Sequence, residues 1–323
     1  MQISTSAPRG RTRRYRLSVV LAVLLILTGC GVRLDVPPAP APVPEGQDEV
    51  RQEAAQAVSV ILQSAELAIP DAPEQVGGVL QAVAADAQAH LEALGGVWEP
   101  PPRPEPEDPE DAPPAQPEPI TAAGASDVLA ALEAAAPQLR GGAAGVEPDL
   151  AVLLVSVSAN QHVHARDLAG ALGADPAPPP AEPADPADAY PAAFGPEAAP
   201  LCRALDAAGY LAEVRAGRAS GEEAARLAER AQELRAQAEL VATRGGFSGT
   251  EEDPREIAYA LAFEDLPAQA QALALTRVPA WLNLLESAEE GADRELIAIQ
   301  VITAALAVHG RGEPVPTFPG RAG

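Results

Sequence analysis

Apolar residues recur every three or four positions along most of this chain, a spacing that predicts amphipathic helices. Between about residues 48 and 68, for example, Val50, Ala54, Ile61 and Ala65 share one helical face. The predicted helices cover about 48–68, Asp71 to Gly95, 126–139, 148–172, 197–217, 220–244, 267–288 and 292–309. Strand-like alternation is not convincing anywhere, so the pattern predicts an all-α fold of antiparallel helical bundles.

Residue types at the expected helix ends support these boundaries. Asp71, Ser126 and Ser220 stand where N-caps are expected, and a glutamate follows Asp71 and Ser220 three positions later, as in a capping box. Pro279 falls inside the expected helix 267–288, where we expect it to kink or split the helix.

Proline-rich stretches divide the helical pattern into modules. Residues 30–46 are expected to form an extended tether, and residues 174–192 a linker. The acidic, proline-rich residues 99–119 cannot bury a core and are expected to be a disordered loop. This organisation predicts an N-terminal helical module at 47–173 and a C-terminal bundle at 193–320. Whether the two modules dock as one larger body stays open.

The N-terminal 29 residues have the features of a bacterial lipoprotein signal peptide. Five arginines precede an apolar run of about 11 residues, which is short of the roughly 20 that span a membrane. The run ends in Leu27-Thr28-Gly29-Cys30, which matches a lipobox. An uncleaved anchor with an incidental cysteine is the alternative. The motif predicts a diacylglycerol and a fatty acyl group such as palmitate on Cys30, and a protein held at the extracytoplasmic face of the cell membrane.

The charge of the chain excludes several classes of function. It has 22 basic and 46 acidic residues. Five basic residues lie in the signal peptide, so 17 remain against 46 acids, a formal charge of −29. Such a surface repels nucleic acid, so nucleic-acid binding is excluded. Every basic residue is arginine, which rules out a Schiff-base lysine and a P-loop lysine. After lipidation only Cys202 remains, and we expect it to be a small buried apolar residue.

The second half of the chain resembles a known family over about residues 196–320. The run Leu205-Asp206-Ala207-Ala208-Gly209-Tyr210-Leu211, the hairpin through Gly246 and the terminal Pro316-Thr317-Phe318-Pro319-Gly320 resemble a ferritin-like domain of unknown function from actinobacterial proteins. The resemblance implies a ferritin-like four-helix bundle. Members often carry Glu-His in the first helix, where this chain has Asp206-Ala207, and histidine in the second helix, where it has Glu229 and Glu233.

Ferritin-like di-iron sites need Glu-x-x-His pairs on two helices. None of the four histidines, His90, His162, His164 and His309, follows a glutamate at that spacing. A di-iron oxidase is therefore not expected, no catalytic residue is assigned, and no cofactor besides the lipid on Cys30 is predicted.

Several residues remain weaker candidates for binding a metal. His162 and His164 are two positions apart on a helix and cannot share one ion. His90 and His164 lie on or near apolar faces and could meet beside Asp86, either as a metal or pH-sensing site or as hydrogen-bonded core histidines. The remaining candidates are three carboxylates of the C-terminal bundle: Asp206, Glu229 and Glu233.

Two functions are consistent with these features. The first is a lipid-anchored, non-catalytic binding or scaffold module of the cell envelope, with the membrane and an envelope protein as partners. The second is a metal-handling ferritin-like protein with carboxylate ligands of unusual type. The fold class alone does not distinguish them.

Overall fold

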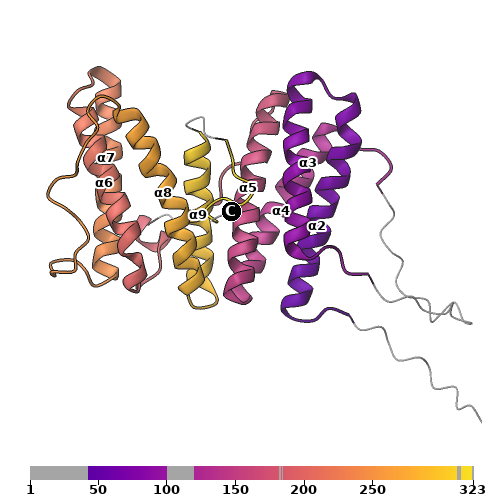
Figure 1. Ribbon diagram of the computed structural model, residues 1–323, viewed down its shortest axis with the longest axis horizontal. Helices are drawn as coiled ribbons and strands as arrows, with labels where there is room; N and C mark the ends of the chain where they lie inside the picture. Colours follow the sequence, from indigo (N-terminus) through magenta and orange to yellow (C-terminus); the bar gives the residue numbers. More distant parts are fainter. Residues whose placement is uncertain (1–42, 100–119, 182, 184, 311–313, 322–323) are drawn as a thin grey trace, which may run out of the picture. The chain divides into compact units, whose positions relative to one another are not determined.

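The computed structural model describes residues 43–99, 120–181, 183, 185–310 and 314–321 (Figure 1). These residues belong to one compact unit, Val43–Gly323. The predicted signal peptide, the lipobox with Cys30, most of the tether and residues 100–119 of the acidic loop lie outside the described residues. Of the helices that are described, none combines the length and the apolar character needed to cross a bilayer.

The described residues form eight α-helices and four short 3₁₀ turns, without a strand. The α-helices are α2 Gln47–Ala68, α3 Glu74–Leu94, α4 Ala125–Gly142, α5 Pro148–Leu172, α6 Ala199–Ala216, α7 Gly221–Arg244, α8 Leu266–Ser287 and α9 Ala292–His309. The predicted all-α fold is confirmed. Helix α8 continues through Pro279 and is not split by it.

The helices pack as bundles around one continuous apolar core. α2 packs on α3 and α4, and α5 packs on α3 and α4. α6 packs on α7 and α8, and α8 packs on α9. α5 also contacts α8 and α9, so helices from the two predicted modules touch each other (Figure 1). Sixteen of the 25 residues of α5 are buried, as expected for a helix with neighbours on all sides.

The predicted side-chain N-caps of α3, α4 and α7 are wrong. Asp71 lies in a 3₁₀ turn before α3, and no side chain caps that helix. Ser126 lies inside α4, which begins after Gly124; the Gly124 N–H donates to the Asp127 carboxylate over 2.7 Å. Ser220 is the N-cap of α7, but its side chain makes no capping hydrogen bond. The helix ends here depend on backbone and tertiary contacts more than on these side chains.

The C-terminal end of the predicted linker 174–192 is packed onto the helices. Tyr190 is buried, and the centre of its ring lies 5.5 Å from the centre of the Trp281 ring in α8. The Arg244 guanidinium donates hydrogen bonds to the carbonyls of Tyr190 and Pro191, each over 2.8 Å. This part of the segment is therefore fixed against both α7 and α8.

Candidate functional site

The structure brings His90, Asp86 and His164 into one hydrogen-bonded cluster between α3 and α5. His164 Nε2–H donates to Asp86 Oδ2 over 2.8 Å, and the Asn160 amide donates to the same oxygen over 2.8 Å. The Thr317 hydroxyl donates to Asp86 Oδ1 over 2.7 Å. His90 Nε2–H donates to the Thr317 carbonyl over 2.7 Å. Thr317 therefore links the two histidines through the carboxylate.

The C-terminal segment that contains Thr317 closes this cluster. The Pro316 carbonyl accepts a hydrogen bond from Asn160, and the Pro319 carbonyl accepts one from Ser156, each over 3.0 Å. The Phe318 ring meets His90 edge to face, with ring centres 5.2 Å apart. Buried side chains of α5 thus bind the backbone of a segment that has no regular structure of its own.

The surroundings fix the charges in the cluster. Burial alone would raise the pKa of the Asp86 carboxyl, but hydrogen bonds from His164, Thr317 and Asn160 outweigh burial and lower this pKa to about 2. Burial lowers the pKa of His90 to about 4, although its bond to the Thr317 carbonyl opposes the shift. At neutral pH, Asp86 is therefore ionised and His90 is neutral.

The metal-site candidates do not converge on an ion-binding geometry. The atoms of Asp86, His90 and His164 nearest one another already form hydrogen bonds within the protein. Nowhere in the part of the chain that the structure describes do three His, Cys, Asp or Glu side chains form a group that could hold a metal ion.

Asp206 has a different environment from that of the other carboxylate candidates. It is 4% exposed in α6, where its two oxygens accept from Arg235 over 2.5 Å and from the Tyr259 hydroxyl over 2.8 Å. Glu229 and Glu233 lie exposed on α7. The three carboxylates are therefore not assembled into one site, and the contacts of Asp206 join α6 to α7 and to the loop before α8.

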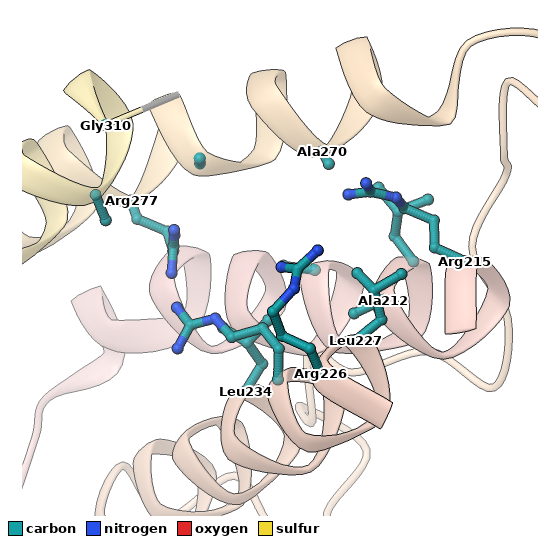
Figure 2. A pocket seen from close by; sticks show the side chains of 13 residues that line it. Ala212, Arg215, Arg226, Leu227, Leu234, Ala270, Arg277 and Gly310 are labelled. Carbon is teal, nitrogen blue, oxygen red and sulfur yellow. The ribbon is translucent and has the colours of Figure 1, made fainter. Parts of the chain in front are cut away.

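A cavity of about 370 Å³ lies among α6, α7, α8 and α9. Four arginines line it, one from α6, two from α7 and one from α8: Arg215, Arg226, Arg230 and Arg277. The other described lining residues are alanines and leucines, with Gly310 at the end of α9, and none of them is acidic. In Figure 2, Arg277 lies at one end beside Gly310, Arg215 lies at the other end near Ala270, and Arg226 lies between them. We call this space the arginine cavity.

The four guanidinium groups differ in their surroundings. Arg277 is 6% exposed, whereas Arg215 and Arg230 are half-buried and Arg226 is exposed. Arg230 is paired with Glu233 on α7 over 2.8 Å. Arg215 and Arg226 make no side-chain hydrogen bond or ion pair with the described residues. The cavity thus presents positive charge, part of it without a partner among the described groups.

A second hollow, of about 500 Å³, lies beside α6 and the loop before α8, but it lacks this charge. The arginine among its lining residues, Arg203, forms an ion pair with Glu256, which lines the same hollow. The arginine cavity is therefore the stronger candidate for binding a ligand.

Sequence reasoning missed the arginine cavity. The two arginines of α7, Arg226 and Arg230, are four positions apart and so share a helical face. Arg277 is the single charged residue between Leu266 and Leu285 on an otherwise apolar and amide-bearing helix. That isolated charge is the signal that could have marked the site.

Comparison of the chain with family models, with curated proteins and with solved structures finds no match. The resemblance to actinobacterial ferritin-like domains accordingly stays a prediction.

Proposed function

We propose that this chain is a lipid-anchored, non-catalytic binding protein of the bacterial cell envelope, and that the arginine cavity is its ligand site. The anchor is supported by the lipobox that ends at Cys30, after an apolar run too short to span a membrane. The proposal of ligand binding is supported by the arginine cavity. Its volume of about 370 Å³ falls within the range of small-molecule sites, and it combines apolar walls with a few charged groups.

The chemistry of the other clusters favours binding over catalysis. Cys202 is fully buried, and burial raises the pKa of its thiol to about 12, so the reactive thiolate is scarce. Asp86 and His90 use their polar atoms to hold the C-terminal segment. These groups support the structure and are poorly placed to meet a substrate. The metal-handling alternative stays a prediction that no contact in the described residues favours.

Metabolic labelling with a fatty acid tests the anchor. The full chain would be produced in bacteria supplied with labelled palmitate, alongside Cys30→Ser and the matched variant Cys202→Ser, which removes the other cysteine. We expect label and membrane association in the wild type and in Cys202→Ser, and neither in Cys30→Ser. Label that persists in Cys30→Ser, or a wild-type chain recovered without lipid, would contradict anchoring at this cysteine.

Thermal stabilisation by small metabolites tests the cavity as a ligand site. Residues 31–323, which contain the whole compact unit, would be screened for compounds that raise the melting temperature. Ala270→Trp places a large side chain in the cavity, and Ala272→Trp places one on the exposed face of the same helix. We expect a stabilising compound to lose its effect in Ala270→Trp alone. A shift that survives Ala270→Trp would place the ligand elsewhere.

A further inference from the structure

The arginine cavity concentrates positive charge in a strongly acidic molecule. Arginine supplies 22 of 323 residues, so thirteen residues drawn at random would include about one, yet four of the thirteen lining residues are arginine. The formal charge of the whole chain is −24. A local site of opposite sign therefore stands out from the average surface and attracts small anions.

The charges are spread along the cavity and are not gathered at one point. Ala270 and Arg277 lie seven residues apart on α8, which corresponds to about 10 Å along the helix. Figure 2 shows Arg277 at the Gly310 end of the cavity and Arg215 near Ala270 at the other end. A single small oxyanion is too short to reach both ends, so one phosphate or carboxylate would satisfy only part of the site.

Arg226 lies between the two ends, and most of the other described lining residues are apolar. These are mainly small and aliphatic side chains, including Ala208, Leu211, Leu234 and Ala274. Such a surface favours contact with hydrocarbon or with the apolar face of a ring. The described lining therefore combines groups that bind anions with groups that contact an uncharged body.

Guanidinium groups suit this role because they stay charged at every accessible pH and bind carboxylates or phosphates through paired N–H donors. Arg277 is 6% exposed, and a buried charge interacts more strongly with a counter-charge than an exposed one does. Among the described residues no carboxylate lines the cavity, and Glu233 beside it is paired with Arg230.

We propose that the arginine cavity binds an elongated small molecule that carries an oxyanion, carboxylate or phosphate, at each end of an apolar or ring-like body. The inference deepens the proposed function and rests on it only in taking this cavity as the ligand site. Large polyanions are disfavoured, since the cavity is small and the rest of the chain is negatively charged.

Calorimetric titration at low ionic strength tests the ligand class on residues 31–323. The carboxylate pair is suberate and octanoate, which have chains of the same length with two and one carboxylates. The phosphate pair is fructose bisphosphate and fructose monophosphate. We expect the two-ended member of at least one pair to bind about tenfold or more tightly than its one-ended partner, because a second charge-assisted contact is made. The pair that binds identifies carboxylate or phosphate as the natural group.

Two results would overturn the inference. One is that neither two-ended compound binds. The other is that each one-ended compound binds as tightly as its two-ended partner, which would reduce the site to a single anion contact. Added salt should weaken a genuine interaction, because part of the attraction is screened.

Variants of single arginines connect the binding to the cavity. Arg226→Gln alters an exposed side chain without described partners, so the fold should be retained. Arg277→Gln removes the buried charge, and circular dichroism would check its fold. Each change should weaken the two-ended ligand about tenfold, whereas Arg166→Gln, an exposed arginine of α5 outside the cavity, should leave binding unchanged. Equal affinity in all three variants would overturn the assignment.

The outcomes separate this inference from the proposed function. A neutral compound that raises the melting temperature of the wild type but not of Ala270→Trp would uphold the ligand site and refute the two-ended anion. Tight binding of suberate or fructose bisphosphate to residues 31–323, together with a full-length chain recovered without lipid, would uphold the anion site and refute the anchor.

Discussion

Mild acid should destabilise this fold through two histidines, His90, which is buried, and His162, which is partly buried. Burial lowers the pKa of His90 to about 4. Burial and the nearby Arg140 guanidinium lower the pKa of His162 to about 4. In an unfolded chain both imidazoles would have a pKa near 6.5. The folded protein therefore holds both side chains neutral over a pH range in which the unfolded chain binds protons.

The sign and size of the effect follow from this difference. Above about pH 6.5 the two states bind the same protons, and these histidines contribute no pH dependence. Below that value the unfolded state gains a proton at each site, so the free energy of unfolding falls by about 1.4 kcal/mol per pH unit for each histidine. The fall continues to about pH 4, where the folded state begins to bind protons as well. At about pH 5, each histidine should have lowered the free energy of unfolding by about 2 kcal/mol.

The lowered pKa of Asp86 does not change the free energy of unfolding between about pH 7 and pH 5. Its folded value of about 2 and its ordinary value of 3.8 place its contribution in stronger acid. Stability from Asp86 is present above pH 3.8 and is lost as the pH falls towards about 2. A measurement between about pH 7 and pH 5 therefore isolates the histidines from this carboxyl group.

Urea unfolding of residues 31–323 at about pH 7, 6 and 5 would measure the effect. His90→Gln keeps an N–H donor for the Thr317 carbonyl and removes the titrating ring. The variant should recover about 2 kcal/mol of the loss at the lowest pH. His162→Gln should recover a similar amount, and the double variant should show a nearly flat profile. If the loss between pH 7 and 5 is unchanged in the double variant, these two histidines are not its cause.

Three further changes test other parts of the structure. Asp206→Ala should lower the free energy of unfolding by about 2 kcal/mol, measured with urea, since it leaves Arg235 and Tyr259 without their shared acceptor. Thr317→Val keeps the shape of the side chain and removes its hydroxyl, so a loss of about 1.5 kcal/mol and faster proteolysis of the C-terminal segment are expected; an unchanged digest would contradict the contact. Cys202 should resist alkylation in the native protein and react after denaturation, as mass spectrometry would show.

The helices could be predicted well because their ends are signalled locally. The predicted helix 148–172 matches α5; Pro148 fits the first turn of a helix, and in the structure Gly173 adopts the left-handed conformation that ends it. Caps were predicted poorly for a related reason. Ser220 is the N-cap residue of α7, yet its side chain makes no capping bond, and the residue type alone does not reveal side-chain direction.

The sequence also predicted part of the histidine cluster. Asp86 and His90 lie four positions apart on one face of α3, so helical spacing alone places them together. Thr317, which joins them, is 227 positions from His90 and belongs to no helix. A contact over that separation depends on how the bundles pack, which the periodicity of a single helix does not contain.

The two polar regions differ in the source of their counter-groups. In the histidine cluster the chain supplies every partner that the charged Asp86 needs, from His164, Asn160 and Thr317, and the C-terminal segment then covers them. In the arginine cavity no carboxylate is among the described lining residues, and Glu233 beside it is paired with Arg230, although the chain has more than twice as many acidic as basic residues. Arginine beside a preformed space, in a protein so rich in acids, supports the proposal that this site receives its anion from outside.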